Sequence, residues 1–221
     1  MSRLFDNAAS QKLLYTSPVL TAAPMTMSCW FYTDETTNQT LLALGNSTNT
    51  TDAFRLMLRA PADPSQGVMA ATNAPASGGE VTTTTTYSTN TWHHGAAVFA
   101  SSSSRSAYLD GGGKATDTAS GTPTVDQTSI GVWDRLVPVG YMSGRIAEVA
   151  VWNVALSDEE IVSLAKGFSP VLIRPSALVA YWPLFGNDSP ELDRWKSRFD
   201  MTVTGATKDV HSRMYYPINP V

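Results

Sequence analysis

The feature that most constrains this fold is a long series of short strand-like runs, separated by glycine, proline, asparagine, aspartate or serine. The runs are LLYTSPVL, MTMSCWFYT, QTLLALG, AFRLMLRA, GVMAAT, TWHHGAAVFA, SRSAYLD, TSIGVW, SGRIAEVAVWN, ALVAYWPL and MTVTGAT. Closely spaced strands with turn residues between them are typical of all-β proteins. About a dozen such strands in 221 residues predict an antiparallel two-sheet jelly-roll sandwich.

One segment departs from the strand pattern and predicts a single short helix. Ser157 and Glu160 have the spacing of a capping box, in which each side chain accepts a backbone N–H at the start of the helix. The acids at 158–160 complement the helix dipole, and Gly167 is a common C-terminal stop. Capping therefore explains three consecutive acids that would otherwise suggest a metal site or a catalytic pair.

The run before this helix, GRIAEVAVWN, predicts a central strand because both of its faces are largely apolar. Strict alternation would place Glu148 on the same face as Ile146, Ala150 and Trp152. Tryptophans inside such strand patterns are expected in the core, and these are Trp30, Trp152 and Trp182.

Two further runs carry turn and edge signals. Asp110 and Gly111 supply the positive φ angles of a tight hairpin turn. The threonine run EVTTTTTYS has high β propensity but no apolar face of its own, so it predicts an edge or solvent-facing strand.

Composition narrows the classes of partner. Charged residues make up 15% of the chain, against about 25% in typical proteins, and the net charge is −4. Without a basic stripe, nucleic acid is not an expected partner. No run is long enough to span a membrane, and MSRLFDNAASQKLL lacks the apolar region of a signal peptide. We therefore expect synthesis in a cytoplasm and no membrane partner.

The domain boundary is predicted at a proline-containing connector, GFSPVLIRPSA. Residues 1–168 are expected to form the sandwich, and residues 169–221 a C-terminal extension that adds strands and ends in a docking tail. The tail, MYYPINPV, has two prolines that exclude it from a central strand, yet it is unusually apolar for a chain end. The sequence therefore predicts that residues 213–221 pack along a surface of this subunit or of a neighbour.

Three segments, in order, resemble the concanavalin A-like, laminin-G/pentraxin-like superfamily. TWHHGAAVFASSSSRSAYLDGG is similar to its Trp-x-His strand and Tyr-x-Asp-Gly hairpin, and GYMSGRIAEVAVWNVALSDEEIVSLAKG to its Gly-Arg-Ile-x-Glu-Val strand and short helix. SRLFDNAASQKLLYTS with MTMSCWFYT resembles its opening strands. The resemblance implies the fold but not one function, since this fold hosts lectins, adhesion modules, hydrolases, lyases and structural subunits.

The C-terminal part, LVAYWPLFGNDSPELDRWKSRFDMTVTGATKDVHSRMYYP, resembles the opening strands of a further such module and the tails of stand-alone members in bacteriophage and prophage genomes. That resemblance implies a non-enzymatic decoration protein located on the virion, which binds coat or tail protein and sister copies as a homo-oligomer. The alternative is a lectin-like module that binds cell-surface glycans. A polysaccharide hydrolase is a third, disfavoured interpretation.

Metal sites are weakly indicated. His93 and His94 are adjacent, so a strand points them to opposite sides and they do not form a zinc pair. The resemblance implies calcium as the possible cofactor, and the loop acids that could contribute ligands are Asp110, Asp117, Asp126 and Asp134. Because these acids do not form a dense cluster, each is equally explained as a turn former, and no resident metal is expected.

Catalytic signals are sparse. A retaining glycosidase needs two carboxylates about 5 Å apart, and the Glu-x-Asp-x-x-Glu motif of the glycosidase branch does not occur. Glu80, Glu148 and Glu191 are isolated in the sequence. There is also no Gly-x-Ser-x-Gly elbow to activate a serine. The sequence therefore predicts a protein that is not an enzyme.

The candidate binding residues lie in one loop and in the tail. The loop GVWDRLVPVGYMSG carries Trp133, Asp134, Arg135 and Tyr141, which together could stack on a sugar and hydrogen-bond to it. Tryptophan and arginine are also enriched in protein interfaces, and Trp133 could instead cap the core. Glycan contact, protein contact and a structural role stay open here. Tyr215 and Tyr216 are the candidate partner-binding residues of the tail.

Overall fold

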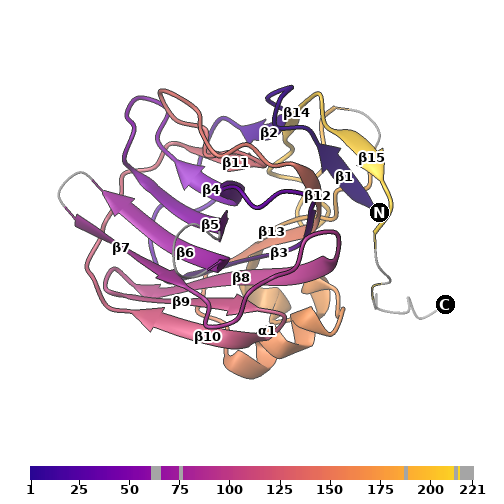
Figure 1. Cartoon of the computed structure of the whole chain (residues 1–221). Helices are drawn as coiled ribbons and strands as arrows, with labels where there is room; N and C mark the ends of the chain where they lie inside the picture. The colour runs from indigo at the N-terminus through magenta and orange to yellow at the C-terminus, as the bar shows by residue number, and fades with distance from the viewer. Residues whose placement is uncertain (61–65, 75–76, 187–188, 212–213, 215–221) are drawn as a thin grey trace.

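The computed structural model of the chain is a sandwich of two antiparallel sheets, which confirms the predicted all-β fold class (Figure 1). The described residues are 1–60, 66–74, 77–186, 189–211 and 214. Among them, the strands are four to ten residues long in most cases, as the sequence pattern predicts, and they are joined by both tight turns and longer loops. No helix in these ranges has the length and apolar character needed to cross a membrane.

One sheet has seven strands, in the order β14-β2-β11-β4-β5-β6-β7. Their bounds are β14 Thr202–Thr204, β2 Lys12–Tyr15, β11 Gln127–Ile130, β4 Gln39–Gly45, β5 Ala53–Arg59, β6 Gly67–Ala74 and β7 Ser77–Thr82. Only the start of the predicted threonine strand, residues 80–82, lies in an edge strand, since β7 is the last strand of this sheet and ends at Thr82.

The other sheet has eight strands, in the order β10-β9-β8-β3-β12-β1-β15, with β13 also paired to β12. Their bounds are β10 Gly112–Asp117, β9 Ser104–Leu109, β8 Trp92–Ser101, β3 Met25–Thr33, β12 Gly144–Trp152, β1 Ser2–Phe5, β15 Thr207–Asp209 and β13 Leu178–Trp182. The predicted hairpin turn joins β9 to β10, with φ at 53° for Asp110 and 76° for Gly111.

The main core lies between the two sheets and is filled by the inward-facing residues of each strand. Phe31 and Phe99 from the eight-stranded sheet meet Phe54 and Leu42 from the seven-stranded sheet, and all four are at most 3% exposed. Cys29 is also fully buried here, so desolvation raises the pKa of its thiol far above the ordinary value. The thiol is therefore a packing group, as predicted for a lone cysteine in a strand.

A second apolar cluster closes the outer side of the eight-stranded sheet. Helix α1 (Asp158–Ala165) and two 3₁₀ turns, η1 (Pro170–Leu172) and η2 (Pro175–Ala177), lie over this side (Figure 1). Ile161 and Leu164 of the helix pack in one cluster with Trp152 and Ala96 of the sheet. The predicted capping box is present, because Ser157 Oγ accepts from Glu160 N and a Glu160 carboxylate oxygen accepts from Ser157 N.

The strand before the helix departs from the predicted alternation. A bulge interrupts β12 between Ala147 and Ala150, and Glu148 has a φ of 54°. The bulge shifts the pattern, so that Ile146 and Val149 both face the main core. The prediction that Ile146 shares a face with Ala150 and Trp152 is therefore wrong, because an extra residue in a strand resets its period of two.

Two smaller predictions also need correction. Trp30 is half-buried on the outer side of the eight-stranded sheet instead of lying in the core, whereas Trp152 and Trp182 are fully buried. The run MTVTGAT is not one strand. Gly205, with a φ of 73°, takes the chain from β14 in one sheet to β15 in the other.

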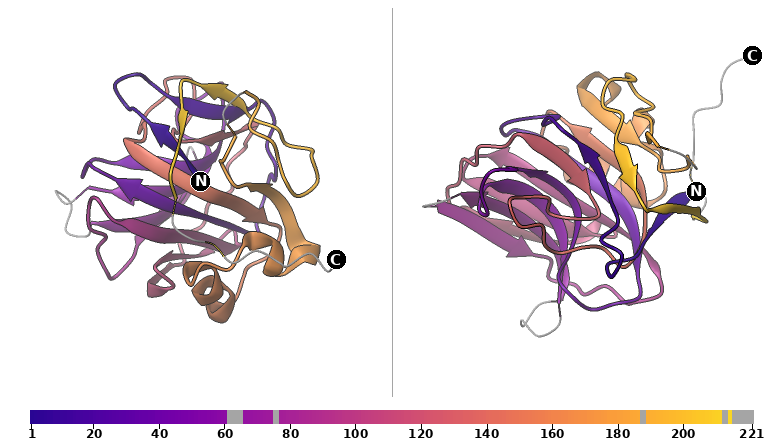
Figure 2. Two further views of the ribbon diagram at one scale, coloured as in Figure 1. Left: turned by 90° about the vertical axis from the view of Figure 1, so that its right-hand side faces the viewer. Right: turned by 90° about the horizontal axis from the view of Figure 1, so that it is seen from above.

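Residues after 168 contribute to both sheets. Strand β13 pairs with β12, β14 with β2 and β15 with β1 (Figure 2). The buried side chain of Arg3, in the first strand, donates from Nε to Glu191 Oε2 at 2.8 Å and from Nη1 to the Ala206 carbonyl at 2.9 Å. The predicted docking tail, 213–221, lies almost wholly outside the described residues.

Candidate functional site

The strongest candidate site is the outer side of the seven-stranded sheet, where polar groups gather above small and apolar residues. In β5, Phe54, Leu56 and Leu58 point into the core, so the alternate residues Arg55, Met57 and Arg59 point outward. We call the outward surface formed by Arg55, Arg59, Asn73, Glu80, Trp133 and Arg135 the arginine face.

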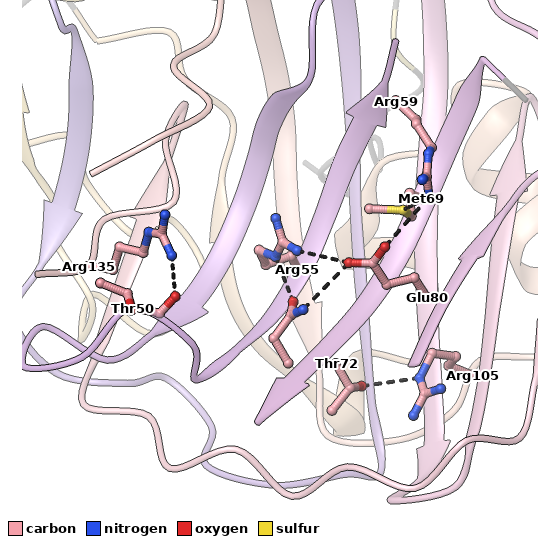
Figure 3. A network of polar contacts seen from close by, with 9 residues as sticks. Thr50, Arg55, Arg59, Met69, Thr72, Glu80, Arg105 and Arg135 are labelled. Carbon is pink, nitrogen blue, oxygen red and sulfur yellow. Dashed lines mark hydrogen bonds and ion pairs between the residues drawn. The ribbon is translucent and has the colours of Figure 1, made fainter. Parts of the chain in front are cut away.

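Three strands contribute to the network on this face (Figure 3). Arg55 Nε donates to Asn73 Oδ1 at 2.9 Å, and Arg55 Nη2 donates to Glu80 Oε1 at 3.3 Å. Arg59 Nη1 lies 3.5 Å from Glu80 Oε2, so the one carboxylate is shared by two guanidinium groups. These groups come from neighbouring strands β5, β6 and β7, which fixes their spacing on a rigid sheet.

Trp133 lies beneath this network instead of projecting from it. The guanidinium carbons of Arg55 and Arg135 lie 4.0 and 4.3 Å from the centroid of its ring. The indole packs on Ala43 and Ala53 and is 7% exposed. It is therefore not the open stacking platform that the sequence allowed, nor does it cap the main core, because its cluster is separate.

Small residues on the sheet explain why the indole fits there. A Cβ at Gly45 would lie 2.9 Å from the backbone oxygen of Asp134 and 3.4 Å from Cδ1 of Trp133. With only Ala43, Gly45 and Ala53 on this part of the surface, the loop can rest directly on the backbone of β4 and β5. A larger side chain at Gly45 would displace the loop and the ring.

The loop 131–143, which joins β11 to β12, is fastened at several points. Gln127 Nε2 donates to the Asp134 carbonyl at 2.8 Å, and Lys12 Nζ lies 2.7 Å from Asp134 Oδ2. Asp134 is 6% exposed and forms this ion pair within the chain, and its predicted role in binding stays a prediction. Tyr141 is half-buried on the returning part of the loop, beyond Gly140, whose carbonyl accepts from Thr40 N.

Arg55 is buried, with 7% of its surface exposed, so its charged form is disfavoured by loss of contact with water. Desolvation lowers its pKa to about 10, Glu80 opposes that shift, and the nearby charge of Arg135 adds to it. Desolvation also lowers the pKa of Arg135. Both side chains remain cations at neutral pH, held near each other around one indole.

An apolar floor lies beside these charges. Met57, Met69 and Ala71 form a small cluster on the same side of β5 and β6, each at most 5% exposed. Arg59 Nη1 lies 3.3 Å from Met69 Sδ. The face thus combines fixed hydrogen-bonding groups at its surface with apolar support beneath them, an arrangement suited to binding a polar ligand.

The four acids proposed as calcium ligands lie apart, each with its own protein partner. Asp110 Oδ2 lies 2.7 Å from His93 Nδ1, and Asp126 accepts from both N and Oγ of Ser47. Asp117 pairs with Arg105, a 1% exposed arginine that also reaches Thr72 across the sandwich (Figure 3), and Asp134 pairs with Lys12. No three His, Cys, Asp or Glu side chains converge within the described ranges. The expectation of no resident metal, with calcium as the possible exception, stays an untested prediction.

The three glutamates considered for catalysis are also in separate surroundings. Glu148 is 1% exposed and accepts from the Tyr181 hydroxyl, and Glu191 is 2% exposed and pairs with Arg3. Glu80 pairs with Arg55 and Arg59 on the arginine face. Each carboxylate thus serves a different contact.

Arg55, Arg59 and Asn73 were not identified from the sequence, although the alternation in AFRLMLRA marks the two arginines as outward-facing, and Glu80 was considered only as a catalytic carboxylate. An aromatic cluster on the other sheet was also missed. There, half-buried Trp30, Tyr32 and Trp92 lie side by side, and His211 packs 4.4 Å from the Trp92 ring. Tyr215 and Tyr216 lie outside the described residues.

Two cavities lie away from the arginine face. One, of about 340 Å³, is lined at one end of the sandwich by small residues such as Thr21, Ser101 and Thr122, with Phe54 also on its wall. The other, of about 360 Å³, is lined by Val19, Val179 and Phe199 together with Asn153, Lys196 and Arg198. Neither lining combines donors with a carboxylate acceptor as the arginine face does.

Comparisons with solved structures show the same fold at low identity. A candidate carbohydrate-binding protein from Bacteroides ovatus gives a TM-score of 0.65 at 17% identity, over 95% of this chain and 60% of its own length. The carbohydrate-binding module CBM40 of the Ruminococcus gnavus IT-sialidase, bound to α2,3-sialyllactose, gives 0.57 at 18% identity, over 65% of this chain and 83% of the module. The enzymatically active domain of bacteriophage CBA120 tailspike protein 2 gives 0.54 at 14% identity, over 83% of this chain and 31% of that domain.

Comparison of the sequence with protein families identifies one family. No curated protein sequence matches the chain significantly. Residues 6–162 match a laminin-G family model described as the concanavalin A-like lectin/glucanases superfamily. The match spans well over half of the chain and agrees with the two antiparallel sheets, the hairpin and the capped helix. The chain therefore belongs to the laminin-G-like branch of the concanavalin A-like lectin/glucanase superfamily.

Proposed function

We propose that this protein is a non-catalytic carbohydrate-binding module and that its arginine face is the binding surface. The observation that carries the proposal is the shared network of Arg55, Asn73 and Glu80 on adjacent strands, with an apolar floor beside it. Similarity to carbohydrate-binding structures supports the proposal.

The chemistry of the face suits sugars. Guanidinium and amide groups donate, while carboxylate and amide oxygens accept, so the network offers both partners that a pair of vicinal hydroxyls requires. Glu80 is exposed, and Asn73 and Arg135 are half-buried, so a ligand can reach them. Because rigid strands hold these groups, little side-chain freedom is lost on binding.

A binding role without catalysis is part of the same proposal. Glu148 and Glu191 are each about 2% exposed or less and are held by other residues, so neither faces the network as a second carboxylate beside Glu80. Hydrolysis by a glycosidase needs such a pair of carboxylates. A turnover assay on labelled polysaccharides is expected to show binding without release of products.

The test is a blocked variant compared on a glycan array and by calorimetry. Asn73→Trp places a bulky side chain on the face without removing a charge, and it is expected to abolish glycan binding. Thr116→Trp, at an exposed and uncharged position of β10 at the edge of the other sheet, is the matched control and is expected to bind as wild type. Glycan binding that survives Asn73→Trp, or a wild-type protein that binds no glycan, would contradict the proposal.

A second function, decoration of a bacteriophage particle, is favoured by one observation, the likeness of 83% of the chain to a tailspike domain. In this proposal the module sits on the virion, contacts coat or tail protein and sister copies, and carries its glycan site outward. Co-sedimentation with intact particles tests it. Deletion of residues 213–221 is expected to weaken assembly while leaving the sandwich folded, and wild-type occupancy of the truncated protein would argue against the tail as the contact.

A further inference from the structure

The charges around the arginine face are unevenly balanced. Among the described residues that make up the arginine face, Glu80 is the one carboxylate, and it is shared by Arg55 and Arg59. Beside the network, Lys12 and Asp134 neutralise each other at 2.7 Å. The β4–β5 turn adds the carboxylate of Asp52, which accepts from Asn49 Nδ2.

Arg135 is the least compensated of these cations. Its Nε donates to the Val137 carbonyl at 3.0 Å and its Nη1 to the Thr50 carbonyl, which are neutral acceptors. No carboxylate among the described residues forms an ion pair with it. The guanidinium is half-buried and lies over the Trp133 ring, so the position of the charge is fixed rather than mobile.

Arg55 contacts the same indole, and its positive charge repels that of Arg135. Both guanidinium carbons are within 4.3 Å of the Trp133 centroid, and the two like charges raise each other's energy. The pKa of Arg55 is lowered partly for this reason. An anion placed beside Arg135 would relieve the repulsion and would gain a strong, charge-assisted hydrogen bond.

We infer that the arginine face selects glycans that carry a carboxylate, with the sugar carboxylate held by Arg135 beside Trp133 and the sugar hydroxyls by Asn73 and Glu80. This inference rests on the proposed glycan-binding function and adds the ligand class to it. A sialic acid and a uronic acid present the same carboxylate chemistry. Extended polyanions fit less well, because the chain has a net charge of −4 and no basic stripe.

The experiment compares acidic ligands with neutral partners of the same size by calorimetry. One arm uses sialyllactose against lactose, and the other uses a disaccharide with a single uronic acid against its carboxyl-reduced form, so the two arms separate the two sources of carboxylate. We expect acidic ligands in at least one arm to bind about tenfold or more tightly than their neutral partners, since a charged hydrogen bond is of that order. The preference is expected to fall as salt rises.

Variants of two arginines that each lie over an aromatic ring test whether Arg135 causes the preference for acidic ligands. Arg135→Gln is expected to remove most of the preference for the acidic ligand while leaving the weaker binding of the neutral ligand, and Arg135→Lys to restore part of it. Arg145→Gln is the control, because Arg145 also lies over an aromatic ring, that of Tyr32 at 4.6 Å, but on the other sheet. It is expected to bind acidic ligands as wild type.

The outcomes separate the two proposals. Equal binding of acidic and neutral ligands, blocked by Asn73→Trp, would overturn the carboxylate inference and keep the glycan-binding function. An acidic preference that persists in Arg135→Gln would overturn the assignment to Arg135. Binding to no ligand in either arm, with a folded protein, would overturn both.

Discussion

The two outer sides of the sandwich differ in how far other segments of the chain cover them. The eight-stranded sheet is covered over much of its outer side by helix α1 and by residues 170–177, which bury Trp152 completely. On the outer side of the seven-stranded sheet, the loop 131–143 packs on Ala43 and Ala53, and beside it lies a row of guanidinium, amide and carboxylate groups. Both sheets have well-packed inner sides.

The difference shows which surface serves folding and which is available to a ligand. The covered side presents Ala96, Ala150 and Trp152, which are apolar and would be costly to leave in water. The open side presents side chains that remain favourable in water and that a polar ligand can contact. The following predictions test whether stability and binding separate between the two sides in this way.

The largest expected effect is on the covered side. Trp152→Ala removes a fully buried indole and its hydrogen bond to the Ile173 carbonyl at 2.8 Å. We expect the free energy of unfolding to fall by about 3–5 kcal/mol, measured by denaturant titration. Arg135→Gln on the open side is expected to cost about 1 kcal/mol or less. Similar losses of unfolding free energy in the two variants would show that the two outer sides contribute equally to stability.

The next prediction concerns acid. His94 is 1% exposed against Trp30, and desolvation lowers its pKa to about 4. The folded state therefore keeps His94 neutral while the unfolded chain, with a pKa near 6.5, binds a proton. Stability from this residue is complete above pH 6.5 and is lost as the pH falls towards 4, by roughly 1.4 kcal/mol for each pKa unit of the difference.

His94→Gln is expected to flatten this dependence in unfolding measurements between pH 7 and 4. A residual slope of the same sign should remain, because desolvation also lowers the pKa of His211, to about 3. Arg55, with a pKa of about 10, stays charged throughout, so the charge of that arginine on the open side does not change. An unchanged slope in His94→Gln would show that His94 does not control acid stability.

The parts of the fold that follow local rules could be predicted from the sequence. The Asp110-Gly111 turn and the capped helix each depend on neighbouring residues, and the structure confirms them. The bulge at Glu148 could not be predicted in this way. Its carboxylate is held by the Tyr181 hydroxyl, 33 residues away in sequence, so local alternation contains no sign of it.

The candidate site shows the same limit. The sequence indicated Trp133 and Arg135 because tryptophan and arginine share one loop. It did not indicate Arg55, which covers the indole from another strand, or the small residues Ala43 and Ala53 that let the ring lie flat on the sheet. Burial of a loop tryptophan depends on which distant strands pass beneath it, and that is a property of the topology.

The smallest effect is expected at the start of helix α1, which closes the covered side. Ser157 Oγ accepts from Glu160 N at 3.4 Å, and the Glu160 carboxylate accepts from Ser157 N at 2.7 Å. Ser157→Ala removes only the first bond, because Glu160 is also held by Arg174 Nε at 2.7 Å. We expect the free energy of unfolding to fall by about 1 kcal/mol, which corresponds to about 2–4 °C in melting temperature.

Ser163→Ala, within the same helix, is the control and is expected to change stability by less, since its hydroxyl donates to the Glu159 carbonyl inside the helix. Glycan binding should be unchanged in both variants, because the helix lies on the opposite side from the arginine face. Loss of glycan binding in Ser157→Ala at unchanged stability would mean that the helix serves the site directly and that the two sides are not separate.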